Sequence, residues 1–155
     1  MNTNQLRAPT IKDNYLVENY VPVLPNEISN MEANEAERAV RAPKTSFLVM
    51  KHHKYVIIAT ESIAHFYVKY GTSIIVCFDK QEYFVSHSLE QVQNLVSSKQ
   101  FFRLNRQYLI NFRAVKEVEH YFARKLLVHS VVPVADKLLV PKEKASAFLN
   151  WLDHR

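Results

Sequence analysis

The sequence after Pro43 predicts a mostly β domain, built from short, mainly antiparallel strands with one or two small helices. Apolar runs of strand length, rich in β-branched and aromatic residues, follow one another with polar turns between them. Only two later segments repeat their apolar residues at helical spacing. Four of the six prolines punctuate the first 43 residues, and the pattern changes to short strands after them.

Residues 1–43 are interpreted as an extended, partly helical arm or linker, and residues 44–155 as the folded domain. Residues 31–41 have the pattern of a short helix, because acidic side chains lie near its start and basic ones near its end. Its apolar positions are mostly alanines. We therefore expect a weakly packed arm.

An antiparallel meander with tight turns is expected in the first half of the domain. The expected strands are Ser46–Met50, Tyr55–Ala59, Ile63–Tyr70, Thr72–Asp79 and Gln81–Ser86. Residues 60–62 form a brief turn that can begin one helical turn, and Gly71 joins the third strand to the fourth.

A helix is expected to begin at Ser88. Ser88 and Gln91 are three residues apart, which is the spacing of a capping box. The apolar residues of this segment form a single stripe at helical spacing. They are Leu89, Val92, Leu95 and Val96. The stripe predicts a face packed against the core.

The second half of the domain contains further strands and a last helix. Two alternating runs lie on either side of a polar corner at residues 105–107. Three more strand candidates follow, at Val115–Tyr121, Lys125–His129 and Lys137–Val140. Pro141 suits the first turn of a helix. The buried stripe expected on that helix is Ala145, Phe148, Leu149 and Leu152.

Glycine and cysteine usage excludes several kinds of site. A single glycine, Gly71, cannot build a Walker loop, a dinucleotide fingerprint or an EF-hand loop. A single cysteine, Cys77, excludes an intrachain disulfide and a CxxC metal site. Its apolar neighbours indicate a reduced thiol in the core.

Neither an enzyme active site nor a metal or cofactor site is expected. The seven histidines lack HExxH or H-x-H spacing. No G-x-S-x-G turn is present, and the acidic residues after Pro43 are spread thinly.

Charge divides unevenly along the chain. Residues 1–43 carry a net charge of −2 and residues 44–155 a net charge of +7, for a total of +5. A basic domain of this size suggests a polyanionic partner. The start of the chain lacks the apolar region of a signal peptide, and no apolar run approaches the roughly 20 residues that span a bilayer. We expect a cytoplasmic protein without a membrane partner.

The polar corner contains the first candidate binding residues, Arg103, Asn105, Arg106 and Gln107. Arginine pairs bidentately with guanine edges, and asparagine and glutamine pair with adenine edges. A solvated loop that contains a structural arginine is the alternative interpretation.

Two further candidate sites are basic. Lys142 and Lys144 fall in the first turn of the last helix, where helix N–H groups bind phosphate well. Ordinary surface charge is the alternative, because Glu143 lies between them. The other site is the hairpin Lys69-Tyr70-Gly71-Thr72-Ser73, with a cation, an aromatic ring and hydroxyls near one turn.

Four blocks of this sequence, spread over residues 45–153, resemble LytTR DNA-binding domains. The segment Phe101–Asn111 resembles the FFRVHRSYIVN-type signature of that family. Ile63–Phe66 is similar to its "edIayf" strand, and Ser88-Leu89-Glu90 to the start of its helix. Val140–Lys144, with Phe148 and Trp151-Leu152, resembles its closing segment. The resemblance implies about ten short strands in stacked sheets, and double-stranded DNA binding by loops.

The DNA contacts that the resemblance implies fall on the three sites already described. They are Thr72 or Ser73, the corner Asn105-Arg106-Gln107, and Lys142. Asn105 and Gln107 replace common histidine and serine residues, and Lys142 replaces an arginine and so loses the planar fork. Pro141 replaces the usual serine. The 43 preceding residues are too few for the receiver domain that response regulators of this family carry.

The resulting hypothesis is a bacterial transcription regulator, similar to response regulators, that binds promoter DNA as a pair of protomers on repeated half-sites. Arg106 and Asn105 would read bases. The residues expected to hold phosphates or support the corner are Lys69, Arg103, Lys142 and Lys144. The alternative is a β-rich protein-interaction or ligand-sensing module whose basic surface meets an acidic protein.

Overall fold

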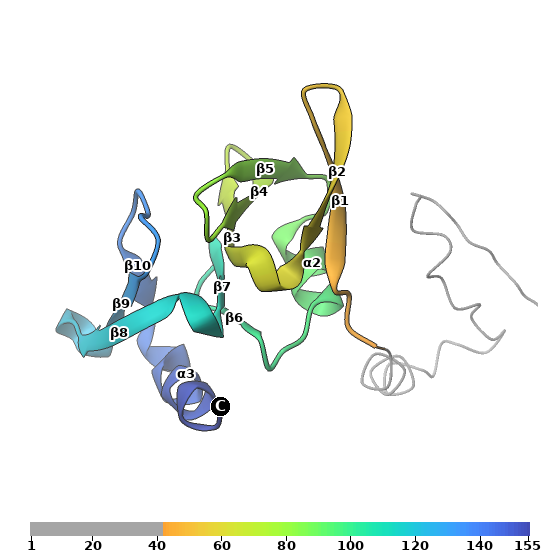
Figure 1. The fold of residues 1–155 in the computed structure, drawn as a ribbon. Coiled ribbons are helices and arrows are strands. Elements are labelled where there is room, and N and C mark those ends of the chain that lie inside the picture. The colour runs from red at the N-terminus through yellow and green to blue at the C-terminus, as the bar shows by residue number, and fades with distance from the viewer. Residues whose placement is uncertain (1–41) are drawn as a thin grey trace, which may run out of the picture. The chain divides into compact units, whose positions relative to one another are not determined.

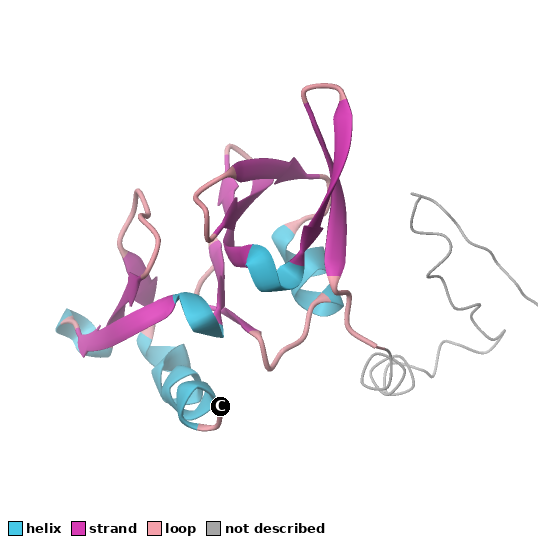
Figure 2. Cartoon of the chain, viewed as in Figure 1, coloured by secondary structure: helices cyan, strands magenta, loops and turns pink. Residues whose placement is uncertain are grey.

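A computed structural model describes residues 42–155 of the chain, and the helix expected at residues 31–41 lies outside these described residues. The described residues form ten strands in three antiparallel sheets, together with two α-helices (Figures 1 and 2). This confirms the predicted fold class. Within the described part of the chain, no helix is long and apolar enough to cross a membrane.

The largest sheet has five strands in the order β5-β4-β3-β7-β6. Its strands are β3 (Ile63–Lys69), β4 (Thr72–Cys77), β5 (Glu82–Val85), β6 (Phe101–Arg103) and β7 (Tyr108–Asn111). Strand β7 returns to pair with β3, so Tyr108 lies beside Tyr67 in the register. This pairing places the β6–β7 corner next to the end of β3.

A two-stranded hairpin precedes this sheet. It consists of β1 (Ser46–Lys51) and β2 (Lys54–Ala59), followed by the short 3-10 turn Thr60–Ser62. The turn residues His52 and His53 both have positive φ, of 52° and 64°. Two residues with positive φ give the type I′ geometry that suits the twist of a hairpin.

The third sheet has three strands in the order β10-β9-β8. They are β8 (Val115–His120), β9 (Leu126–Ser130) and β10 (Leu138–Val140). Two 3-10 turns flank β8, at Phe112–Ala114 and Phe122–Arg124.

Helix α2 (Leu89–Leu95) begins with the predicted capping box. The Gln91 backbone N–H donates to Ser88 Oγ at 3.1 Å, and the Ser88 N–H donates to Gln91 Oε1 at 2.8 Å. These reciprocal bonds satisfy two N–H groups at the start of the helix.

Helix α3 (Lys142–Asp153) begins directly after Pro141, as expected. Phe148 is fully buried, but Leu149 is exposed, so the prediction of a buried Leu149 was wrong. The helix instead turns Trp151 inward, where its ring lies 5.2 Å from that of Phe102. Trp151 Nε1 donates to the Ser98 carbonyl at 2.8 Å. Trp151 thus packs against this core, although the predicted stripe did not include it.

The five-stranded sheet contributes side chains to two separate cores. One core contains β1, β2 and α2 side chains, and the other contains side chains of the three-stranded sheet and α3. This arrangement explains the continuous apolar runs of β3 and β4, since both faces of these strands are covered. Cys77 is buried in the first core, and burial, with nearby Asp79, raises the pKa of its thiol to about 11.

Candidate nucleic-acid interface

Arg103 supports the β6–β7 corner from within. Its Nε donates to the Asn105 carbonyl at 2.7 Å, and its Nη2 donates to the Arg106 carbonyl at 3.0 Å. Its Nη1 donates to Gln93 Oε1 on α2 at 2.9 Å. Partial burial lowers the pKa of Arg103 from its usual value. The guanidinium group thus holds the backbone of the corner and ties it to α2.

Asn105 also directs its side chain into the protein. Its Oδ1 accepts hydrogen bonds from the backbone N–H groups of Gln107 at 2.8 Å and Tyr108 at 3.1 Å. Its Nδ2 donates to the Leu139 carbonyl at 2.8 Å. Both ends of the amide are used within the protein, so Asn105 shapes the corner and links it to β10.

Arg106 and Gln107 occupy the exposed tip of the corner. Neither side chain makes a hydrogen bond to any other residue in the described part of the chain. These two side chains are therefore available to a ligand.

The β3–β4 hairpin lies beside this corner, because the Val68 N–H donates to the Gln107 carbonyl at 3.0 Å. Its turn consists of Tyr70 and Gly71, with φ of 51° and 76°. Tyr70 is exposed, and Lys69 Nζ lies 5.8 Å from the centre of its ring. The hairpin therefore presents a cation and an aromatic ring next to Arg106.

The structure distinguishes the two hydroxyl residues that follow this turn. Thr72 is exposed at the start of β4. Ser73 is only 5% exposed, and it pairs with Val68 on one side and Val85 on the other. Of the two alternatives, only Thr72 presents its side chain to a ligand.

The first turn of α3 is joined to the same corner. Lys144 Nζ donates to the Arg103 carbonyl at 3.0 Å. Partial burial lowers the pKa of Lys144, and the nearby charge of Arg103 lowers it further. Lys142 is exposed, and it makes no side-chain hydrogen bond within the described residues. Lys144 is thus a structural tie, and Lys142 is the free cation of this turn.

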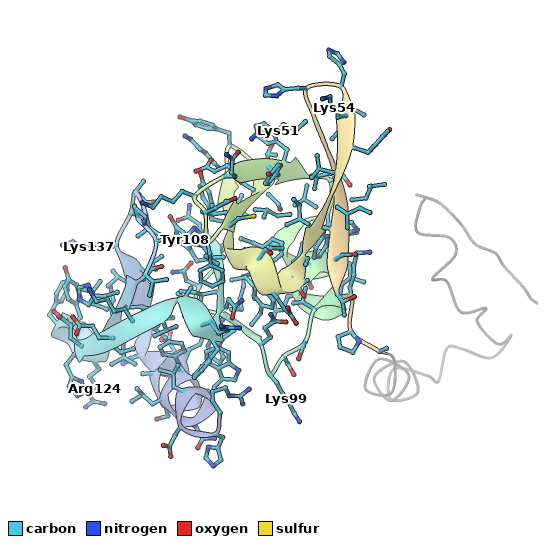
Figure 3. The ribbon with its side chains drawn as sticks, viewed as in Figure 1. Lys51, Lys54, Lys99, Tyr108, Arg124 and Lys137 are labelled. Atoms are coloured by element: carbon cyan, nitrogen blue, oxygen red, sulfur yellow. The ribbon has the colours of Figure 1, made fainter. Side chains whose placement is uncertain are left out.

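Tyr108 is the first residue of β7 and is buried in the core that the five-stranded sheet shares with the three-stranded sheet (Figure 3). Its O–H donates to Asp136 Oδ2 at 3.0 Å, and its ring stacks on Tyr67 with centroids 5.7 Å apart. Burial and this hydrogen bond raise the pKa of the phenol. Sequence reasoning found Tyr108 only as an alternating apolar residue, and no local pattern indicated Asp136.

The three candidate segments thus form one surface, which we call the basic surface. Its exposed side chains are Lys69, Tyr70, Thr72, Arg106, Gln107 and Lys142. The ion pair between His129 and Glu119 is the one found among the described residues, so the exposed cations of this surface have no carboxylate partner there. A surface of this charge attracts polyanions.

Comparison with known proteins gives a consistent result. Residues 53–153 match the family model of the LytTr DNA-binding domain. A search of curated proteins gives no match. Among solved structures, the chain is similar to the LytTr DNA-binding domain of a putative methyl-accepting/DNA response regulator from Bacillus cereus. That match has 15% identity and a TM-score of 0.62, and it covers 70% of this chain and 97% of the other. At this identity, the structural match shows the shared fold.

Proposed function

Since the chain belongs to the LytTr DNA-binding domain family, we propose that it is a transcription regulator that binds defined sites in double-stranded promoter DNA. One observation carries the proposal. Three segments that are distant in the sequence are tied together by internal hydrogen bonds, and together they expose cations without carboxylate partners. Loop side chains, and not a recognition helix, read the bases in this proposal.

The exposed residues divide into two roles. Arg106, Gln107 and Thr72 have free polar groups that can reach base edges, and Arg106 suits guanine. Lys69 and Lys142 hold phosphates, because a flexible ammonium group is a good point charge for a polyanion. Tyr70 packs against the sugar–phosphate backbone beside Lys69.

The remaining candidate residues do not contact DNA in this proposal, and most of them hold the DNA-contacting residues in position. Arg103 and Lys144 support the corner and the first turn of α3. Asn105 was expected to read a base, but its amide is used internally, so we assign it a positioning role. Ser73 is assigned to the core because it is buried.

The proposal also includes the partner and the setting. Two copies bind repeated half-sites in the cytoplasm, and the chain has no catalytic role and needs no cofactor. Affinity is expected to fall steeply with salt, because cations that contact phosphates release condensed counterions.

The experiment that tests this proposal is selection of duplexes from a random pool by the full chain, followed by footprinting. We expect one enriched motif with protected half-sites. The Arg106→Ala variant should enrich it weakly, and the control variant Arg113→Ala, an exposed arginine outside the basic surface, should enrich it normally. Equal binding of all duplexes and of unrelated polyanions would refute the proposal and favour an interaction module with a basic surface.

A further inference from the structure

The turn between β8 and β9 presents two aromatic rings beside cations. Phe122 is 68% exposed, and the centre of its ring lies 4.7 Å from that of the partly buried Tyr121. Lys125 Nζ lies 5.4 Å from the centre of the Phe122 ring, and Arg124 at the tip is exposed. We call residues 121–125 the aromatic turn. None of the sites described above includes it.

The backbone of the aromatic turn is closed by two hydrogen bonds. The Tyr121 N–H donates to the Lys125 carbonyl at 2.9 Å, and the Lys125 N–H donates to the Phe122 carbonyl at 3.3 Å. Ala123 and Arg124 at the tip both have positive φ, of 59° and 62°. Glycine and asparagine are usual at such positions, because other residues are strained there. The chain therefore keeps an exposed guanidinium group at a position that would suit glycine better.

The charge around the aromatic turn is positive. Its charged residues are Arg124 and Lys125, and Lys137, which precedes β10, lies over the second ring at 5.8 Å. The nearest acidic residue along the chain is Glu119, and its carboxylate lies 3.1 Å from His129. Within the described residues, none of the three cations has a carboxylate partner. Exposed rings beside unpaired cations suit a polyanion that also has apolar surface, and the sugar–phosphate backbone of DNA offers both.

The aromatic turn adjoins the basic surface at the start of α3. Val140, the last residue of β10, pairs with Leu126, the first residue of β9. Paired strands lie about 4.8 Å apart. Lys125 directly precedes this pair, Lys142 comes two residues after it, and α3 contacts the segment Phe122–Arg124. A duplex held by Lys142 therefore passes close to the aromatic turn.

The two ends of this combined surface lie on different sheets. In Figure 1 the aromatic turn is at the end of β8, on the side of the three-stranded sheet away from the five-stranded sheet. Arg124 and Lys137 lie on that outer side in Figure 3. Tyr70, by contrast, lies in the turn between β3 and β4 of the five-stranded sheet. The surface that runs from Tyr70 through Lys142 to Arg124 therefore extends beyond the residues assigned to base reading.

We propose that the aromatic turn is a second contact with the same DNA duplex, on the flank next to the part of the site that Lys142 holds. Arg124 and Lys125 each hold a phosphate there, and the Phe122 ring lies against the sugar rings between them. This inference rests on the proposed DNA-binding function and deepens it. The contact touches no base edge, so it adds affinity whatever the sequence of the flank.

Duplexes with and without flanks test this contact. The selected motif is used once without flanking base pairs and once with about ten, or one helical turn, on each side. We expect the flanks to raise the affinity of the wild type about tenfold and to steepen its salt slope by about two, one for each cation. Flanks of different sequence should give the same gain.

Each variant of the aromatic turn has a matched control elsewhere on the domain. Phe122→Ala is compared with Phe84→Ala, because the two rings are 68% and 69% exposed. Arg124→Ala is compared with Arg113→Ala, another exposed arginine. The turn variants should bind the bare motif as the wild type does and lose most of the gain from the flanks, and the controls should keep this gain. An equal gain in the wild type and in all variants would overturn the proposal.

Arg124→Gly separates contact with DNA from support of the fold. Glycine relieves the backbone at the positive φ of Arg124, so this variant should unfold at the same or a higher urea concentration than the wild type. It should nevertheless lose the gain from the flanks as Arg124→Ala does. If Arg124→Gly keeps the gain, the guanidinium group holds no phosphate and the proposal is wrong.

A cleavage reagent attached to the aromatic turn locates the contact. Phe122→Cys carrying an iron–EDTA group should cut the flank beside the motif, and Phe84→Cys carrying the same group should not. The buried Cys77 takes up little of the reagent. The absence of flank cuts from Phe122→Cys would contradict the proposal.

Two further outcomes separate the alternatives. If Phe122→Ala abolishes binding to vesicles of anionic phospholipid and leaves the gain from the flanks intact, the aromatic turn binds a membrane and the proposal is overturned. If the wild type binds the bare motif and the flanks add nothing, this inference fails and the proposed function stands. If the wild type binds no duplex at all, the proposed function fails and this inference fails with it.

Discussion

The side-chain amide of Asn105 donates a 2.8 Å hydrogen bond to the carbonyl oxygen of Leu139, 34 residues away. Leu139 lies in β10, the strand that leads directly into α3. The corner that presents Arg106 and the helix turn that presents Lys142 are therefore joined through this amide, in addition to the bond from Lys144 Nζ to the Arg103 carbonyl. A change in this amide should alter both segments together.

Asn105→Ala should lower the free energy of unfolding by about 1–3 kcal/mol, because it leaves the N–H groups of Gln107 and Tyr108 and the Leu139 carbonyl without partners. DNA affinity should fall for every sequence, since the whole surface loses its shape. Urea unfolding and binding to the selected motif and its single-base variants measure both effects. If Asn105→Ala leaves the free energy of unfolding unchanged and relaxes the preference at one base pair, Asn105 reads a base and does not position the corner.

Arg106→Ala should weaken binding to the preferred site by about 1–3 kcal/mol and relax the preference at one base pair. Its free energy of unfolding should stay unchanged, because the side chain makes no hydrogen bond within the described residues. Arg106→Lys should keep the general affinity and lose the base preference, since lysine lacks the bidentate fork. If Arg113→Ala weakens binding to the preferred site by the same amount, only the total charge of the protein determines its affinity for DNA.

A comparison of Lys142→Ala with Lys144→Ala should distinguish a lysine that binds only DNA from a lysine that also supports the fold. Lys142→Ala should reduce affinity equally for all sequences and lower the salt slope by about one, with unchanged stability. Lys144→Ala should also lower the free energy of unfolding by about 1 kcal/mol, because it loses the bond to the Arg103 carbonyl. Paired salt titrations and urea curves measure the difference. Identical behaviour of the two variants would refute these roles.

His65 should make stability depend on pH. It is 2% exposed, its Nδ1 has no hydrogen-bond partner among the described residues, and burial lowers its pKa from 6.5 to about 4. The unfolded chain binds a proton on His65 more readily than the folded chain does. The contribution of the neutral, buried His65 to the free energy of unfolding is therefore complete above about pH 6.5, and it is lost as the pH falls towards 4. The loss is about 3 kcal/mol at most.

His65→Phe is the matched variant for this effect, because a phenyl ring can keep the contacts with Tyr67 and Tyr108. The carboxylates titrate in both proteins, so the difference between the two urea stability curves isolates His65. We expect this difference to change between about pH 6.5 and pH 4. A constant difference across this range would show that His65 does not titrate on unfolding.

Local patterns predicted most of the elements. The strands from Ser46 to Val140, the capping box at Ser88 and the start of α3 after Pro141 all follow from spacing within a few residues. The division of the strands among three sheets, by contrast, depends on pairing between distant segments. A strand pattern shows which residues alternate, but it does not show which strand lies alongside.

The roles within the candidate site were harder to predict for the same reason. Arg103 and Asn105 are polar residues in a loop, and whether they point outward depends on carbonyl groups brought to them by the fold. Ser73 and Thr72 differ by one residue in a strand, so the pleat alone makes one buried and the other exposed. Leu149 matched a helical stripe, but it is exposed, and the partly buried Trp151 packs against the core instead.

Trp151 also has a spectroscopic consequence. It is the sole tryptophan of the sequence, and it lies among the rings of Phe102, Phe112 and Phe148. Its indole N–H binds the Ser98 carbonyl, so its emission reports on the contact of α3 with the segment before β6. Release of α3 would move this indole into water and shift its fluorescence to longer wavelength. The protein therefore contains an intrinsic optical probe of the helix that carries Lys142, readable in stopped-flow without any label.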